Sequence, residues 1–166
     1  MHFISSSQPT AGNARECKGQ SHRITYHLKF ALILRLLSRA LMKEKLLAGT
    51  SIVVDRYSFS GVAFSTAKGM DSKWCWEPEV GLLAPDAIIY LDMPIEDAAQ
   101  RGEFGGERYE KIDFQKTVQG KFKGLQTPEW NVLDARQTIE ELETQIKEIA
   151  LKTVTEVEST EFNTLK

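Results

Sequence analysis

Apolar residues recur at helical intervals in three parts of the chain. The first is residues 28–47, and Gly49 stands where such a helix would end. The second follows Asp113, which can cap a helix, and the third follows Thr138 and Glu141, which have the spacing of a capping box. A short helix is also predicted over residues 94–101, and a loop-rich segment with helical patches over 64–85. The three apolar stripes consist of Leu28, Leu32, Leu36, Ala40 and Leu47, of Phe114, Val118, Phe122 and Leu125, and of Ile139, Leu142, Ile146, Ile149 and Leu151.

Three short apolar runs predict β-strands instead. They cover residues 52–54, 86–92 and 130–135, and they end in Asp55, Asp92 and Asp134. Residues 52–54 are β-branched without a polar interruption, which favours a strand buried on both faces of a parallel sheet. Stretches of about 35 to 40 residues of helix and loop between the runs are typical of a parallel α/β sheet. We expect the three acids on the ligand side of this sheet, where each binds a ligand or caps the next element.

Composition and charge exclude several classes of protein for this chain. The chain has 166 residues, enough for one domain, and 42% of them are hydrophobic. Its net charge of -2 argues against binding to nucleic acid. Cys17 and Cys75 make no disulfide framework, and no run approaches the roughly 20 apolar residues that span a bilayer. We therefore expect neither nucleic acid nor a membrane as partner, and a cytoplasmic location, with nucleus or mitochondrion as alternatives.

The N-terminal part differs in charge from the rest. Residues 1–43 hold seven Lys and Arg and one acid, whereas residues 44–166 hold fourteen basic and twenty-two acidic side chains. An acid-poor start that contains Arg and Ser fits an organelle transit peptide, and a disordered tail or an N-terminus altered by splicing or gene prediction is the alternative. We therefore divide the chain into a divergent segment, 1–27, and a domain, 28–166.

The residues after the first predicted strand are suited to binding an anion. The guanidinium of Arg56 can hold a phosphate with two parallel hydrogen bonds, and Asp55 can hold a metal ion. Ser60, Gly61 and Phe64 then offer a hydroxyl, a close backbone approach and a ring for stacking. A salt-bridged Asp–Arg turn at the surface is the alternative interpretation.

Residues 102–109, GEFGGERY, contain three glycines and predict a flexible flap between Arg101 and Arg108. A mobile loop that carries arginines suits phosphoryl transfer, because it closes, excludes water and neutralises developing charge. A solvent loop with chance arginines is the alternative.

Three sequence segments resemble the thymidylate kinases, in particular eukaryotic and plant-like members. They are DRYSFSGVAFS, WCWEPEVGLLAPDAIIYLDMP and RGEFGGERYE. This family consists of nucleoside monophosphate kinases of the P-loop class, and the resemblance covers residues 43 to about 135. It implies an α/β fold with three layers, in which a P-loop-kinase-like parallel sheet has flanking helices. It also implies phosphoryl transfer from ATP with Mg²⁺ to dTMP, giving dTDP for dTTP biosynthesis, and a homodimer.

The resemblance further implies roles for single residues. Asp55 would hold Mg²⁺ and orient the acceptor, Arg56 would bind the phosphate of dTMP, and Arg101 and Arg108 would close on the phosphates with the lid at 102–109. Nucleoside contacts would come from Ser60, Gly61, Phe64 and Tyr109, and Arg136 would lie near adenine. Phe30 and Arg35 partly match the family motif HLLFSANRWE. In that motif the arginine follows the phenylalanine by four residues, whereas Arg35 follows Phe30 by five.

The phosphate-cradling motif of the P-loop class, GxxxxGK[ST], does not occur in these 166 residues. AGNARECKGQ contains Gly12 and Lys18 but lacks the ending of the motif. The first strand of the family and the lysine and arginine of its P-loop have no counterpart, so we expect an N-terminally truncated version of the fold. A catalytically impaired nucleotide-binding remnant, a partner subunit or an incompletely predicted gene is the alternative to an active kinase.

Overall fold

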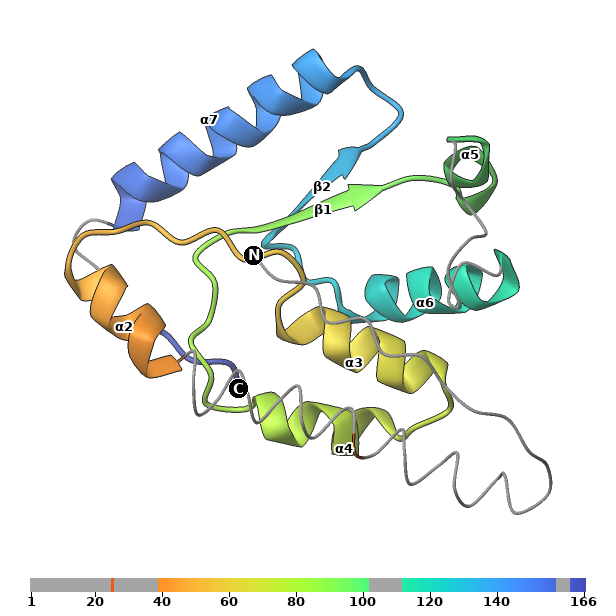
Figure 1. The fold of residues 1–166 in the computed structure, drawn as a ribbon, viewed down its shortest axis with the longest axis horizontal. Coiled ribbons are helices and arrows are strands. Elements are labelled where there is room, and N and C mark those ends of the chain that lie inside the picture. The colour runs from red at the N-terminus through yellow and green to blue at the C-terminus, as the bar shows by residue number, and fades with distance from the viewer. Residues whose placement is uncertain (1–24, 26–38, 102–111, 158–161) are drawn as a thin grey trace.

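The computed structural model of the chain describes residue 25 and residues 39–101, 112–157 and 162–166 (Figure 1). The first part of the helix predicted over 28–47 and the flap predicted over 102–109 lie outside the described residues. The elements in chain order are α2 (Arg39–Leu47), α3 (Ser58–Ala67), α4 (Ser72–Trp76), the 3-10 helix η2 (Glu77–Glu79), β1 (Ile88–Asp92), α5 (Ile95–Gln100), α6 (Ile112–Leu125), β2 (Trp130–Asp134) and α7 (Ile139–Val157).

The strands β1 and β2 pair in parallel, with Ile88 opposite Trp130 and Asp92 opposite Asp134. This pairing confirms the prediction of a parallel α/β arrangement for the second and third apolar runs. Figure 1 shows the two strands with α7 on one side and with α3, α4 and α6 on the other. Asp92 and Asp134 therefore lie next to each other at the carboxyl ends of the strands, where they were predicted.

The prediction of a strand over residues 52–54 is wrong. These residues have no regular structure, and Val53 and Val54 are 95% and 41% exposed. A β-branched run becomes a strand only where a neighbouring strand pairs with its backbone groups. The described residues supply no such neighbour, since their only sheet consists of β1 and β2. The sequence pattern indicated that the run could be buried, but burial depends on the partner.

The helix α2 ends as predicted at Leu47. Gly49 adopts a φ of +79°, its N–H donates to the carbonyl of Leu46 at 2.9 Å, and the N–H of Thr50 donates to the carbonyl of Lys45 at 2.9 Å. These two bonds form the Schellman ending, which satisfies the last helical carbonyls and favours glycine because of the positive φ.

The capping box at the start of α7 is confirmed. The Glu141 carboxylate accepts hydrogen bonds from the Thr138 N–H and hydroxyl at 3.0 Å each, and the Glu141 N–H donates to the Thr138 hydroxyl at 3.2 Å. Asp113, predicted to cap α6, lies instead inside its first turn.

The segment over residues 64–85 is more helical than predicted. The helix α3 extends to Ala67, and α4 follows after a turn at Gly69 with a φ of +87°. Asp71 caps α4, because its carboxylate accepts a hydrogen bond from the Trp74 N–H at 2.8 Å. The short helix predicted over 94–101 is confirmed as α5.

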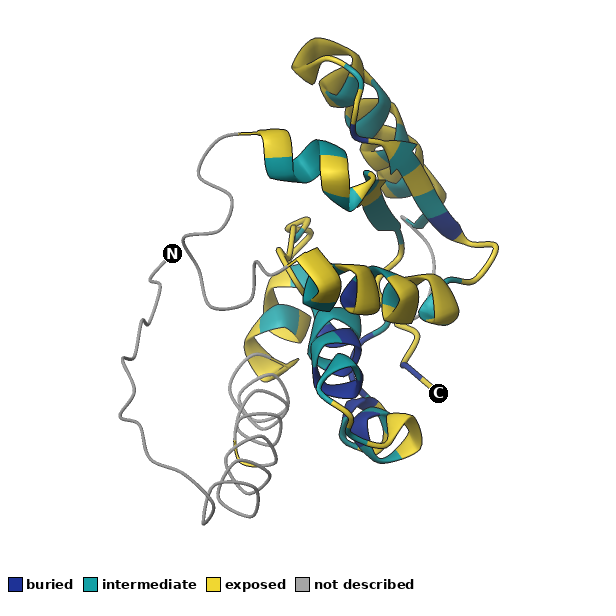
Figure 2. Cartoon of the chain, turned by 90° about the vertical axis from the view of Figure 1, so that its right-hand side faces the viewer, coloured by how far each residue is buried: buried dark blue, intermediate teal, exposed yellow. Residues whose placement is uncertain are grey.

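The core lies around α3 (Figure 2). The C-terminal segment closes it, because the N–H of Leu165 donates to the carbonyl of Leu82 at 2.9 Å and the Trp76 indole donates to the carbonyl of Lys166 at 2.8 Å. The helix α7, by contrast, contains no buried residue. In the described part of the chain, no helix is long and apolar enough to cross a membrane. The buried apolar residues are Val62, Ala63, Cys75, Leu82, Leu83, Val118, Trp130, Ala135 and Leu165.

Candidate active site

An open cavity of about 610 Å³ lies beyond the carboxyl ends of β1 and β2. Asp92 and Asp134 reach it from the strands, and α5 and α6 supply the other walls. In open α/β sheets this is the side on which ligands bind. The lining residues are Asp92, Pro94, Ile95, Glu96, Lys116, Gln119, Lys123, Val132, Asp134 and Arg136.

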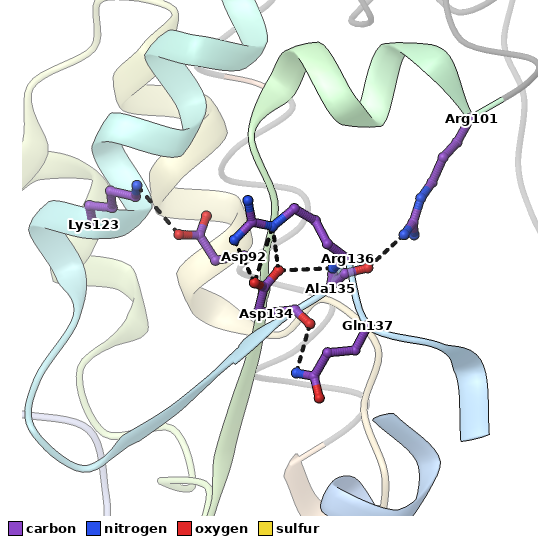
Figure 3. A network of polar contacts seen from close by, with 7 residues as sticks. All are labelled: Asp92, Arg101, Lys123, Asp134, Ala135, Arg136 and Gln137. Atoms are coloured by element: carbon purple, nitrogen blue, oxygen red, sulfur yellow. Dashed lines mark hydrogen bonds and ion pairs between the residues drawn. The ribbon is translucent and has the colours of Figure 1, made fainter. Parts of the chain in front are cut away.

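Each charged side chain that lines this cavity forms an ion pair with another lining residue. The guanidinium of Arg136 contacts both carboxylate oxygens of Asp134, at 2.9 Å through Nε and 2.6 Å through Nη2 (Figure 3). Hydrogen bonding from Arg136 lowers the pKa of Asp134 to about 2. Lys123 pairs with Asp92 at 3.4 Å, and Lys116 pairs with Glu96. The three cations and the three carboxylates that line the cavity therefore neutralise one another.

The structure brings two of the predicted arginines to one loop. Arg101 follows α5 and donates from Nη2 to the carbonyl of Ala135 at 2.7 Å, next to Arg136 (Figure 3). Burial of Ala135 and this bond tie the end of α5 to the end of β2. Arg101 and Arg136, predicted to contact phosphates and adenine, thus both lie at the carboxyl end of β2.

A second cluster surrounds Arg56. The guanidinium of Arg56 lies 5.6 Å from the centre of the Phe64 ring, in cation–π contact. Phe64 in turn packs against Phe114 of α6, with 6.1 Å between the ring centres. Since α6 also supplies Lys116 and Gln119 to the cavity, one helix borders both clusters. Asp55, next to Arg56, is exposed.

The backbone that carries Arg56 is held by hydrogen bonds of the two residues that follow it. Arg56 has a φ of +58°, and Tyr57 is extended before α3 begins at Ser58. The Tyr57 hydroxyl donates to the carbonyl of Leu83 at 3.1 Å, and the Ser58 hydroxyl donates to the Glu79 carboxylate at 2.6 Å. Burial and the nearby charge of Glu79 raise the pKa of Tyr57, which keeps its hydroxyl protonated as a donor.

The remaining predicted residues divide into two groups. Ser60 and Gly61 lie half-buried in α3, and the N–H of Ser60 donates to the carbonyl of Tyr57 at 3.1 Å. Phe30, Arg35, Arg108 and Tyr109 lie outside the described residues.

Sequence reasoning missed the polar wall of the cavity. Lys116, Gln119 and Lys123 lie on α6, and Gln119 donates to the Asp92 carboxylate at 2.8 Å and to the carbonyl of Met93 at 3.0 Å. Their spacing of three and four residues places them on one helical face. This polar stripe is visible in the sequence beside the apolar stripe of the same helix and was a usable signal.

Parallel strands that end in acids on one side, with an arginine turn leading into a helix, define an α/β protein whose ligand side is formed by the strand ends. The sequence profile described as thymidylate kinase matches residues 5–146. The chain belongs to the thymidylate kinase family. The profile match begins well before residue 43, where the resemblance was predicted to begin.

Individual relatives agree with this assignment. Over 139 residues the chain is 48% identical to a thymidylate kinase of Arabidopsis thaliana, a match that covers 84% of this chain and 52% of the relative. Over 123 residues it is 45% identical to human thymidylate kinase, with 70% of this chain and 58% of the relative covered. The chain thus spans about half the length of these relatives.

A solved structure of thymidylate kinase from Candida albicans has the same fold. It superposes with a TM-score of 0.72 at 24% identity, and the match covers 89% of this chain and 73% of that one. Because the identity is low, this likeness concerns the fold alone.

Proposed function

We propose that this chain binds dTMP as the phosphoryl acceptor in the reaction ATP + dTMP to ADP + dTDP, a step toward dTTP. The observation that carries the proposal is the placement of Arg56. Arg56 is exposed, and its guanidinium lies over Phe64 and makes no ion pair within the described part of the chain. A positive charge in this state can take up a phosphate without first leaving a carboxylate.

The other acceptor residues follow from this placement. Phe64 lies beside Arg56, so a nucleotide whose phosphate contacts Arg56 can stack its base on or near that ring. Ser60 and Gly61 lie on the same helix as Phe64. Phe30, Arg35, Arg108 and Tyr109 are proposed as further contacts from the family resemblance, and a homodimer is proposed on the same ground. The cytoplasmic location, with nucleus or mitochondrion as alternatives, stays a prediction.

Magnesium fits the residues near Arg56. Mg²⁺ is usually held by one or two carboxylates together with substrate phosphates, and the exposed carboxylate of Asp55 can serve as one such ligand. When bound, the ion would neutralise charge on the phosphates. No group of three metal-binding side chains occurs among the described residues.

The described residues do not fit the triphosphate of ATP in the same way. Each cation of the cavity is paired with a carboxylate, and the glycine-rich GK[ST] ending is absent from the sequence. ATP as the donor therefore rests on the family alone, and Arg101 and Arg136 are proposed contacts of the donor only once their present partners are displaced.

Nucleotide binding without turnover is a second candidate function. The observation that favours it is that the GxxxxGK[ST] motif does not occur in these 166 residues. In this case the chain would bind dTMP, or would act beside a subunit that supplies the phosphate cradle.

Calorimetry with dTMP, thymidine and ATP tests the acceptor assignment. We expect the 166-residue chain to bind dTMP more tightly than thymidine, because only dTMP offers a phosphate to Arg56, and more tightly than ATP. Binding of ATP that is tighter than that of dTMP contradicts the proposal, as does equal binding of dTMP and thymidine.

A further inference from the structure

The backbone of Arg56 needs an external constraint. A φ of +58° places it in the left-handed region, which side chains other than Gly, Asn and Asp rarely adopt. Such a conformation persists only where the surrounding structure imposes it. Among the described residues, those that follow Arg56 form the regular structure next to it, since residues 51–54 before it have none.

Two hydrogen bonds, one partly buried and one buried, supply this constraint. Tyr57 is tied to the carbonyl of Leu83, and Ser58 is tied to the Glu79 carboxylate at 2.6 Å. Both acceptors belong to one segment, residues 79–83, which the C-terminal residues cover through the pairing of Leu83 with Thr164. The turn after Arg56 is therefore fastened to a packed part of the molecule.

Glu79 is the unusual member of this set. It is 0% exposed, as is Ser58, although a glutamate is rarely buried completely. An apolar residue of similar size would fill the same space without the cost of removing a carboxyl group from water. The carboxylate does what an apolar residue cannot do: it fixes the position of the Ser58 hydroxyl at the first residue of α3.

We propose that Glu79 is a positioning residue for Arg56, acting through its hydrogen bond to Ser58. The bond sets the start of α3, which sets the left-handed turn at Arg56 and aims its guanidinium over Phe64. This inference rests on the proposed role of Arg56 in binding the phosphate of dTMP. The simpler alternative is that the pair stabilises the core and has no effect on Arg56.

Three substitutions separate these possibilities in dTMP and thymidine titrations. Glu79→Leu and Ser58→Ala remove the bond, whereas Glu79→Gln keeps an oxygen that can accept it. We expect Glu79→Leu and Ser58→Ala to weaken dTMP binding by about fivefold to tenfold, the effect of losing one buried hydrogen bond, and to leave thymidine binding unchanged. Glu79→Gln should bind dTMP like the parent.

Two controls accompany these variants. In the Arg56→Ala background, Ser58→Ala should cause no further loss of dTMP binding, because its effect passes through Arg56. Thr138→Ala, in the distant cap of α7, lowers stability without touching α3 and should leave dTMP binding unchanged. Equal losses of dTMP and thymidine, or a further loss in the Arg56→Ala background, overturn the proposal.

A second measurement does not depend on nucleotide. The NMR shift of the Arg56 side-chain Nε–H reports its place over the Phe64 ring. We expect this signal to move toward the value of a free arginine in Ser58→Ala and Glu79→Leu, and to stay in Glu79→Gln and Thr138→Ala. If it stays in all four variants, Glu79 does not position Arg56. If the parent fails to bind dTMP while the signal moves as expected, the proposed function is wrong and the positioning role stands.

Discussion

The arginines of the candidate site differ in the groups that their guanidinium contacts. Arg136 makes a two-pronged contact with Asp134, two residues away, and Arg101 donates to a backbone carbonyl. Arg56 instead lies over an aromatic ring, a contact of about 0.5–1 kcal/mol where it is exposed. A phosphate can therefore bind Arg56 at little cost, whereas Arg136 must first leave a carboxylate.

Replacement of Arg56 by Ala should weaken dTMP binding by at least about tenfold, since hydrogen bonds between charged groups contribute about 1.5–3 kcal/mol each. Arg56→Lys should restore only part of this affinity, because an ammonium lacks the planar fork of a guanidinium. Thymidine serves as the control ligand in the same calorimetric titrations. If the affinities for thymidine and dTMP fall by the same factor, Arg56 has a structural role only.

The contact between Asp134 and Arg136 predicts a pH dependence. The pKa of Asp134 is lowered from an ordinary value of 3.8 to about 2, first by hydrogen bonding from the Arg136 side chain. A lowered pKa means that the contact stabilises the fold above pH 3.8 and is lost as pH falls toward about 2. The midpoint in a carboxyl-carbon NMR titration should lie near 2 in the parent and rise toward 3.8 in Arg136→Ala. An unshifted midpoint in the parent would show that the contact does not persist in solution.

At the scale of elements, short-range signals decide where helices begin and end. The ending of α2 at Gly49 and the start of α7 at Thr138 both involve bonds between residues no more than five positions apart. No residue of α7 is fully buried, although Leu142, Ile146 and Ile149 are half-buried, and the capping box at Thr138 adds to the stability of this helix.

Thr138→Ala should therefore destabilise α7 by about 1 kcal/mol, the usual value of a lost N-cap side chain. The change should appear as reduced helical circular dichroism and faster amide exchange in the first turns of α7. Thr138→Ser keeps the hydroxyl and is the matched control. It should behave like the parent, and an equal loss in both variants would argue against the capping box as the cause.

At the scale of the whole molecule, the shared helix α6 joins the cluster around Arg56 to the cavity at the ends of β1 and β2. Arg56 makes no ion pair within the described residues, whereas the charged groups of the cavity are paired. On the proposed function, the described residues are therefore better suited to the acceptor dTMP than to the donor ATP.

The 166-residue polypeptide should consequently show little dTMP kinase activity when assayed alone. Each preorganised group that stabilises phosphoryl charge contributes about 3–4 kcal/mol, and the motif that supplies several of them is absent from this sequence. A coupled assay of ADP formation from ATP and dTMP is the measurement. Turnover of about 1 s⁻¹ or more, within the ordinary enzyme range, would contradict the expectation.

Much of the secondary structure was predictable, because its causes lie within a few residues. The apolar runs at 88–92 and 130–134, the stripes of α6 and α7, and the glycine after α2 all express preferences of neighbouring side chains. The family motif around Arg56 could likewise be recognised from the order of the residues alone. The sequence by itself thus determined most elements, whereas the acceptor role of the residues around Arg56 stays a prediction.

Only the tertiary structure decided which distant residues meet. Residues 52–54 had the composition of a strand but no neighbouring strand among the described residues. Ser58 and Glu79 are 21 positions apart, Gln119 and Asp92 are 27 apart, and Arg101 and Ala135 are 34 apart. Such bonds depend on how the helices pack, which no local pattern encodes. The proposed positioning of Arg56 by Glu79 depends on such a bond, since Glu79 lies outside the motif that contains Arg56 and meets Ser58 only in the folded chain.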